Sequence, residues 1–460
     1  MKNHIATAFF AVLIAPVLLQ AQGLGSIVGT VTDPSGAAVA SAKITAKEQG
    51  TGLVREAMSD EHGYYVIPSL RPAAYGVSIE ASGFSVAKQE VTLLADQSLT
   101  LNVQLKLGMS TEIVTVSSGD TQVDTTTATI AQVVEQQRMV ELPLNGRNAA
   151  QLALLTSGTN NSPSGGADQG FTKTFPGAVT ISANGARQNM VSYQLDGGNY
   201  VDEYTNVNQP FPFPDALQEF SVQTSNYGAE DGQNAGAVVN VITKSGSNSF
   251  HGNLFEFLRN AVFNARNFFA PLTQPNGQPT KDMGRDQLKR NQFGGTIGGR
   301  IRRDKTFFFA GYQGTRLRNV GNPSASTIPS EADITAFTAT GGAIDPVVAN
   351  VLQGLPIQPT SRSVTFLKPQ DDNYDEVIAR VDHSIRQTDR LAVRYDYNRF
   401  HRDPVFDPAN FLTYADGATI PTQNALIHET HTFKANLITI SASVIRARQQ
   451  AGAPRTPCPA

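Results

Sequence analysis

Apolar and polar residues alternate along much of this 460-residue chain, first in short runs and later in longer ones. The first short run is Ser26–Thr32, and the turn sequence Asp33-Pro34-Ser35-Gly36 follows it. A period of two places alternate side chains on opposite faces of a strand, and Pro and Gly favour tight turns between strands. About seven such runs over residues 24–107 predict a seven-stranded β-sandwich.

The longer alternations lie in the second half of the chain. Val377 and Val381 alternate with Arg380 and Asp382, and a similar run, residues 391–398, follows a predicted turn. Strands of about ten residues with an apolar outward face and a charged inward face are typical of a transmembrane barrel with a wet lumen. We therefore expect a partial barrel over residues 247–460, with about seven strands. Within it, residues 315–373 are expected to be largely loop, with one helical piece near residues 344–352.

Between these regions, residues 125–246 combine short apolar alternations with a segment of helical spacing at residues 148–155. This mixture predicts an α+β domain. The whole chain is thus expected to be mostly β: an N-terminal seven-stranded β-sandwich, an α+β plug domain, and the first strands of an incomplete antiparallel transmembrane β-barrel.

Composition narrows the classes of partner and of compartment. The net charge of −3 gives no reason to expect a nucleic-acid partner, and the single cysteine, Cys458, excludes an internal disulfide. Residues 1–23 combine a basic start, an apolar run from Ile5 to Leu19 and the small-residue site Ala21-Gln22-Gly23. This order predicts a secretory signal peptide.

Candidate catalytic and metal-binding motifs do not fit any known chemistry. His428 and His431 are three residues apart, so on a strand they face opposite sides and cannot share a metal. The cluster Asp60-Glu61-His62 is expected to be a solvated turn, and the glycines of residues 294–299 lack the spacing of a nucleotide-binding loop. We therefore predict no catalytic residues, no metal ligands and no cofactor, and the chain is not expected to be an enzyme.

The middle of the chain carries sequence motifs of a known family. The string Leu142-Pro143-Leu144-Asn145-Gly146-Arg147-Asn148 is followed by several shorter motifs: Asn184-Gly185, Asp196-Gly197, Tyr227-Gly228 and the strand-like Gly236–Lys244. Together they resemble the plug domain of TonB-dependent outer-membrane receptors of the Oar-like branch, with the similarity strongest from Leu142 to Arg316. Ala149 departs from the family pattern, which usually has an aromatic residue there. The resemblance implies a plug that closes a barrel in the outer membrane.

The N-terminal region has a resemblance of its own. Gly29-Thr30-Val31-Thr32-Asp33, Gly63-Tyr64-Tyr65 and Gly83-Phe84 are similar to motifs of the carboxypeptidase-regulatory-like domain, which is a non-catalytic sandwich.

A polar linker over residues 108–124 joins the two regions. Its segment Thr111-Glu112-Ile113-Val114-Thr115-Val116 resembles a TonB box, which couples such receptors to an energised inner-membrane protein of the TonB type. Coupling by strand addition depends on main-chain hydrogen bonds, so its sequence requirements are loose. An ordinary strand or linker explains the segment equally well.

The loop Pro210–Pro214 alternates proline with Phe211 and Phe213. We expect it to be extended and surface-accessible, with the two rings as candidate ligand contacts. A loop packed against the barrel wall is the alternative.

The resemblance implies energy-coupled uptake of an unknown small or oligomeric ligand, such as a metal chelate, vitamin, glycan or peptide. The implied partners are a TonB-type energy coupler and outer-membrane lipid. Plugged transporters use about 22 strands, so seven strands and a non-strand-like C-terminus suggest the N-terminal portion of a receptor. The alternative is a non-transporting cell-surface or periplasmic binding or adhesion protein.

Overall fold

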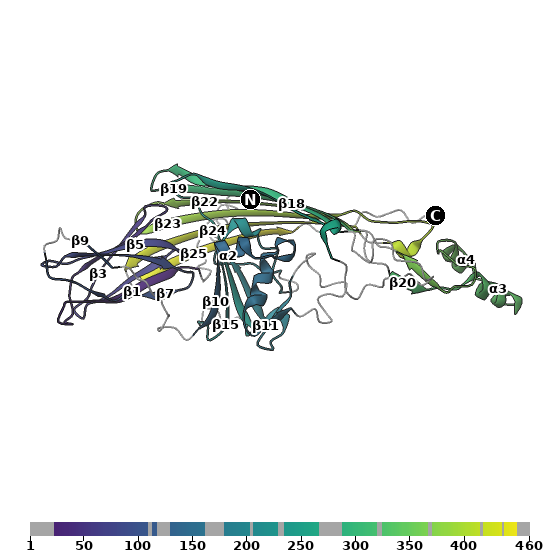
Figure 1. The fold of residues 1–460 in the computed structure, drawn as a ribbon, viewed down its shortest axis with the longest axis horizontal. Helices are drawn as coiled ribbons and strands as arrows, with labels where there is room; N and C mark the ends of the chain where they lie inside the picture. The colour runs from purple at the N-terminus through teal and green to yellow at the C-terminus, as the bar shows by residue number, and fades with distance from the viewer. Residues whose placement is uncertain are drawn as a thin grey trace, which may run out of the picture.

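The computed structural model describes residues 23–108, 113–116, 129–161, 179–202, 206–228, 234–265, 288–319, 324–366, 370–414, 417–434 and 437–448. Within these residues the protein is mostly β with a few short helices, as predicted (Figure 1). None of the described helices has the length and apolar character needed to cross a membrane. Residues 1–22 of the expected signal peptide and most of the expected linker lie outside the described residues.

Residues 23–108, together with strand β9, form the N-terminal unit, which has two sheets. The first sheet has the order β4-β1-β7, with β8 also paired to β1, and the second has the order β3-β2-β5-β6-β9. Alternate side chains of β1, including Ile27 and Val31, enter a core shared with Tyr75 and Ile79 of β5. The strands are β1 (Gly25–Thr32), β2 (Lys43–Glu48), β3 (Val54–Met58), β4 (Tyr64–Leu70), β5 (Ala73–Glu80), β6 (Val86–Leu93), β7 (Ser98–Thr100), β8 (Val103–Gln104) and β9 (Ile113–Val116).

The described residues from 129 to 246 form the middle unit around a sheet with the order β10-β15-β16-β13-β14. Tyr193, Phe220 and Val239 are fully buried in its apolar core. Every residue of β16 is buried, so this sheet is covered on both faces. The elements are β10 (Ile130–Glu135), α2 (Gln136–Glu141), η1 (Asn145–Arg147), η2 (Ala149–Leu155), β11 (Thr159–Asn161), β12 (Ile181–Ala183), η3 (Gln188–Met190), β13 (Val191–Leu195), β14 (Gly198–Asn199), η4 (Pro214–Ala216), β15 (Leu217–Ser225) and β16 (Ala237–Thr243).

Within the described part of the chain, seven antiparallel strands form the long sheet, in agreement with the number expected after Phe250. Its inner face lies against the middle unit (Figure 1) and buries Glu376, Arg380 and Asp382, whereas Val377 and Val381 on its outer face are each 40% exposed. The predicted alternation is therefore confirmed. The strands are β17 (His251–Asn260), β18 (Lys289–Arg302), β19 (Thr306–Asn319), β22 (Gln370–Ser384), β23 (Asp389–Arg402), β24 (Ala418–Lys434) and β25 (Leu437–Arg448), and the turn Ala261–Phe263 (η6) follows β17.

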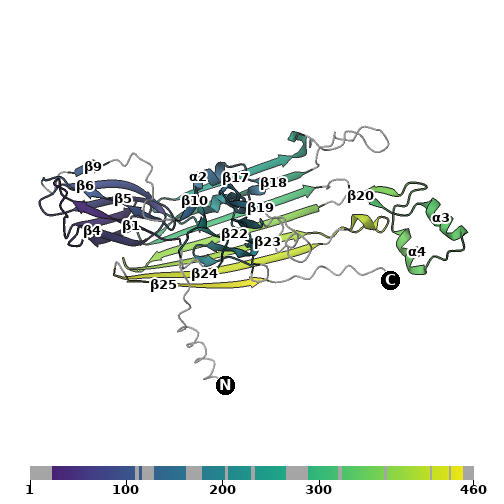
Figure 2. The ribbon, with the colours of Figure 1, turned by 90° about the horizontal axis from the view of Figure 1, so that it is seen from below.

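The two ends of the long sheet differ. At one end the turns are short (303–305 and 385–388), and the N-terminal unit lies there; at the other end the connections are long (Figure 2). One of them carries a lobe of β20 (Ser324–Thr327), α3 (Glu331–Ala339), α4 (Pro346–Gln353) and β21 (Ser363–Phe366), and η8 (Phe411–Thr413) lies in another.

The lobe corrects one expectation from the sequence. Residues 315–373 were expected to be largely loop with one helical piece near 344–352, and α4 confirms that piece. Strand β19 instead continues to Asn319, and α3 is an additional helix because Ser330 and Asp333 form a reciprocal capping box at its start.

Candidate functional site between the middle unit and the long sheet

The Asp196-Gly197 turn places a buried carboxylate against the inner face of the long sheet. Asp196 follows β13 with a φ of 50°, and Gly197 has a φ of 78°. The Asp196 carboxylate accepts hydrogen bonds from the backbone N of Thr243 and from the Thr243 hydroxyl, both at 2.8 Å. These two bonds orient the carboxylate from within the middle unit, independently of its contacts with the long sheet.

Two arginines from neighbouring strands share this carboxylate. Arg380 and Arg394 are direct partners across β22 and β23, and their guanidinium groups donate to Asp196 Oδ1 and Oδ2 at 2.8 and 2.7 Å. Burial alone would raise the pKa of Asp196, but the two arginines and the bonds from Thr243 hold that pKa below its ordinary value. Asp196 therefore remains ionised as a bridge between the two units.

Other buried side chains extend the ionic contacts around Asp196. Arg380 also pairs with Asp382 at 3.0 Å, and Arg394 pairs with Asp396 at 3.2 Å. The Tyr200 hydroxyl of the middle unit donates to Asp396 at 2.9 Å. The result is an alternating network of two arginines and three carboxylates, which we call the Asp196 network.

A second ionic contact, the Arg147 cluster, lies between η1 and the strands β17 and β19. Arg147 is buried and pairs with Asp215 of η4, while its Nε donates to Gln313 at 3.2 Å. Its guanidinium also lies 4.6 and 4.1 Å from the ring centroids of Phe255 and Phe257. Burial lowers the pKa of Arg147 to about 10, so it remains charged at neutral pH.

The rest of the Asn145-Gly146-Arg147 motif also contacts the long sheet. Asn145 Oδ1 accepts from Arg259 at 3.3 Å and from Arg290 at 3.0 Å. The carbonyl of Gly146, whose φ is 70°, accepts from Gln292 at 3.0 Å. The motif therefore acts as one contact surface toward β17 and β18.

The remaining motif residues make contacts within the middle unit. Asn184 Nδ2 donates to the carbonyl of Thr224 at 2.7 Å, and Gly185 occupies a left-handed conformation with a φ of 78°. The Tyr227 hydroxyl donates to the carbonyl of Asn234 at 2.7 Å, and Gly228 follows it. These residues shape the loops around β12, β15 and β16.

The expected exposure of Phe211 and Phe213 is wrong. Phe211 is 6% exposed and stacks on Tyr200 with ring centroids 5.4 Å apart, and Phe213 is 1% exposed. Phe213 packs in a small cluster with Phe309 and Ile378 of the long sheet. The rings are buried because the proline-rich loop lies between the middle unit and the long sheet, which corresponds to the packed loop that was the alternative to a ligand-facing one.

The candidate TonB box is described only in part. Ile113–Val116 forms β9, which pairs in parallel with β6 at the edge of the N-terminal unit, while Thr111 and Glu112 lie outside the described residues. A short edge strand of this kind holds its partner by a few main-chain hydrogen bonds.

The sequence did not identify the contacts that the N-terminal unit makes with the other units. Arg71 pairs with Asp382, and the backbone N of Ala95 donates to Glu219 of β15 at 2.8 Å. Burial raises the pKa of Glu219 to about 7, and the nearby acids Asp96 and Glu135 contribute to the same shift. A cavity of about 260 Å³, whose lining includes Arg71, Asp196 and Arg380, remains where the three units meet.

The comparisons with known proteins follow the same division of the chain. Residues 242–456 match the family described as "Outer membrane beta barrel domain", and residues 26–106 match "Carboxypeptidase regulatory-like domain". The TonB-dependent transporter Oar of Myxococcus xanthus is 28% identical over an alignment of 337 residues, which covers 69% of this chain and 30% of Oar. The chain is a homologue of TonB-dependent transporters.

Two solved structures are also similar to parts of this homologue. The outer membrane transporter YddB from Escherichia coli has 11% identity and a TM-score of 0.43, and the match covers 66% of this chain and 37% of YddB. Catechol 1,2-dioxygenase from Pseudomonas arvilla C-1 has 14% identity and a TM-score of 0.17, and covers 21% of this chain and 56% of the dioxygenase.

The homology to Oar confirms the resemblance found in the sequence and places this transporter homologue in the outer membrane. The relative that the chain matches is named as a transporter. The chain spans 30% of the length of Oar.

Proposed function

We propose that this chain takes part in the energy-coupled uptake of a ligand through a plugged outer-membrane barrel. In this proposal the long sheet is part of the barrel wall, the middle unit is the plug, and the N-terminal unit is a β-sandwich on the periplasmic side. The observation that carries the proposal is the Asp196 network, in which one buried carboxylate of the middle unit is shared by two arginines of the wall.

The geometry of the long sheet supports this orientation. Barrels of the outer membrane have short periplasmic turns and longer extracellular loops. The short turns lie beside the N-terminal unit, and the long connections, including the lobe of α3 and α4, lie at the opposite end (Figure 2). The lobe therefore faces the outside of the cell and is a better candidate for first ligand contact than the buried rings of Phe211 and Phe213.

The polar contact between plug and wall supports a plug that can separate from the wall. Buried ion pairs are costly to break when one partner is lost, but both partners regain hydration when an interface opens to water. The cavity beside Asp196, Arg380 and Arg71 supplies a starting point for water to enter this contact. Force on the chain N-terminal to the plug would then separate the units without unfolding the apolar core around Tyr193.

The segment that would receive this force is the TonB box candidate, Thr111–Val116. Strand β9 pairs with β6 at the edge of a sheet, and the same main-chain groups are those that a partner sheet would need. Release of β9 from β6 would therefore make the segment available to a TonB-type coupler.

The test measures co-purification of the full chain with the periplasmic domain of a TonB-type coupler. Val114→Pro removes a main-chain donor from the segment, and the matched control Ile113→Val keeps the backbone unchanged. The proposal predicts that the control binds and that Val114→Pro loses binding by at least about tenfold. Equal binding by both variants would reject Thr111–Val116 as the coupling segment, and no binding by the unmodified chain would favour a non-transporting surface protein.

A further inference from the structure

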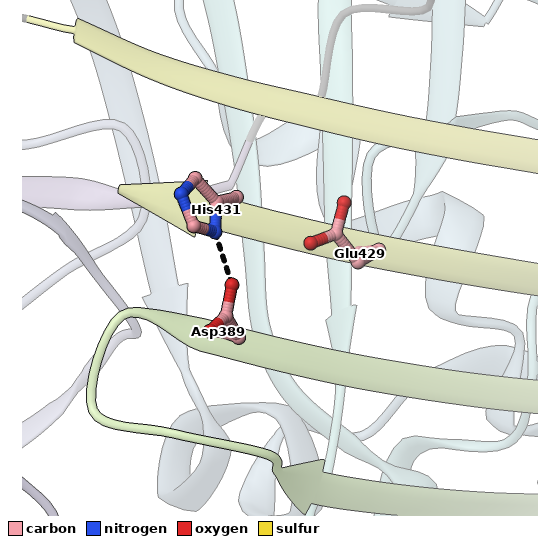
Figure 3. Close-up of side chains that lie close together, drawn as sticks. All are labelled: Asp389, Glu429 and His431. Atoms are coloured by element: carbon pink, nitrogen blue, oxygen red, sulfur yellow. Dashed lines mark hydrogen bonds and ion pairs between the residues drawn. The ribbon is translucent and has the colours of Figure 1, made fainter. Parts of the chain in front are cut away.

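Three ligand-type side chains meet on the outer face of the long sheet, on the opposite side from the Asp196 network. They are Asp389 at the start of β23, and Glu429 and His431 of β24 (Figure 3). Asp389 and His431 are direct partners across the two strands, and Glu429 lies two residues before His431 on the same face. One ligand atom from each of the three residues lies within 4.8 Å of the others.

The cluster includes His431, one of the two histidines that cannot share a metal with each other. His428 and His431 do face opposite sides of β24, as predicted: His428 lines the inner cavity, and His431 bonds through Nδ1 to Asp389. The sequence could not show that Asp389 from the neighbouring strand completes the set with Glu429, because strand register is not readable from spacing within one strand.

We propose that Asp389, Glu429 and His431 bind one Zn²⁺ ion. An imidazole nitrogen and carboxylate oxygens are normal zinc ligands, and a site with three protein ligands leaves a further position open to water. With a neutral imidazole the three ligands carry a charge of −2, which a divalent cation compensates. All three side chains are partly exposed, so an ion can reach them from solution.

The surroundings strengthen the case for a cation. On the same outer face, Val393 is 37%, Ile427 is 46% and Phe433 is 59% exposed, so the two carboxylates lie at the margin of an apolar surface. Carboxylates beside an apolar environment are costly unless they are neutralised. A bound ion would remove this cost and keep both carboxylates deprotonated.

The position of the site gives the ion a structural role. It would join β23 to β24 beside the turn at residues 385–388, where the carbonyl of Gln387 accepts a hydrogen bond from Arg55 of the N-terminal unit. The backbone N of Thr432 also donates to the carbonyl of Thr388 at 3.0 Å. Zinc would therefore stiffen the part of the wall on which the N-terminal unit rests, whether or not the chain transports a ligand.

Calorimetric titration of the metal-free full chain in detergent micelles with Zn²⁺ alone tests the proposal. Glu429→Gln and His431→Ala remove one ligand each, and Co²⁺ substitution gives an absorption spectrum that reports the coordination geometry. The matched control is His401→Ala, which removes another histidine paired with a carboxylate, Asp403 at 3.1 Å, at the opposite end of β23.

The expected result is one equivalent of zinc for the unmodified chain and for His401→Ala, with affinity reduced at least about tenfold in Glu429→Gln and His431→Ala. Heat-modifiable gel mobility shows whether His431→Ala folds. If it does not, the zinc affinity of the isosteric Glu429→Gln is the test. Unchanged affinity in Glu429→Gln, equal weakening in His401→Ala, or the absence of stoichiometric binding would each overturn the proposal and leave an Asp389–His431 pair without a metal.

Discussion

The two faces of the long sheet differ in where their charged residues lie, although the same strands form both. The inner face buries Arg380, Arg394 and Asp396 against the middle unit, and the outer face exposes Val393 and Ile427. In a protein dissolved in water, the buried face of a sheet is normally the apolar one. The inversion is what a membrane wall around a polar interior requires, because lipid replaces water on one side and hydrated or paired charges occupy the other.

The contacts within the middle unit also differ in kind from the contacts between the middle unit and the long sheet. The middle unit is held together internally by an apolar core that includes Tyr193, Phe220 and Val241, whereas its contacts with the long sheet combine buried ion pairs with the small apolar cluster around Phe213. Apolar burial is lost in full when a core opens, while charges that separate into water recover hydration. This difference is the basis of the proposal that the middle unit stays folded if it separates from the long sheet.

Asp196→Ala should have the largest effect, because it leaves Arg380 and Arg394 buried without their shared partner. Removal of one member of a buried ionic network costs about 3–5 kcal/mol, and urea unfolding in detergent micelles measures the loss. Asp345→Ala provides the control, since this exposed residue only caps α4 and should cost about 1 kcal/mol. If Asp196→Ala and Asp345→Ala lose similar amounts of unfolding free energy, the Asp196 network contributes no more to stability than an exposed helix cap, which would contradict this account.

Ile427→Arg tests the outer face. A charge on the lipid side of a barrel costs about 2–4 kcal/mol near the middle of the bilayer, while Ile427→Leu should stay within about 0.5 kcal/mol. The measurement is the free energy of unfolding from lipid vesicles. An arginine tolerated as well as the leucine would mean that this face meets water.

Glu219 gives a smaller, pH-dependent effect at the junction of the N-terminal and middle units. Its pKa is about 7 in the folded chain against an ordinary value of 4.5, so the folded state binds the proton more tightly than the unfolded state. Stability from this group is therefore present at low pH and is lost as the pH rises from about 4.5 to about 7. The loss between about pH 5 and pH 8 is about 2.5 kcal/mol.

The free energy of unfolding is measured across this pH range for the unmodified chain and for Glu219→Gln. The difference between the two isolates the contribution of Glu219 to stability, because the amide has no charge to titrate. The difference between the two curves should shrink on acidification. A difference that does not change with pH would show that Glu219 is already compensated, as Asp196 is.

The strands and their two faces were predictable because a period of two is a local property of the sequence. The alternation of Val377 and Val381 with Arg380 and Asp382 fixed the inner and outer faces, and the turn at residues 385–388 fixed the hairpin. The Asp-Gly turn at Asp196 was also predictable, because such a pair tolerates positive φ. Each of these features depends on residues close together in the chain.

The partners across the units could not be predicted because they depend on how distant segments dock. Asp196 lies 184 residues from Arg380, and Asp389 lies 42 residues from His431. The burial of Phe211 and Phe213 has the same origin, since their loop has the polar-poor, proline-rich composition of either an exposed or a packed segment. Spacing in the sequence shows on which face of a strand a side chain lies, but not which residues it contacts there.

Site-directed spin labelling at position 427 tests the central inversion most directly. The labelled chain would carry Ile427→Cys with Cys458→Ser and be placed in lipid vesicles, with Met58→Cys, on the exposed surface of the N-terminal unit, as the aqueous control. The account predicts that the label at 427 collides mainly with apolar molecular oxygen and the label at 58 mainly with a water-soluble nickel complex. Equal access of the nickel complex to both positions would contradict it.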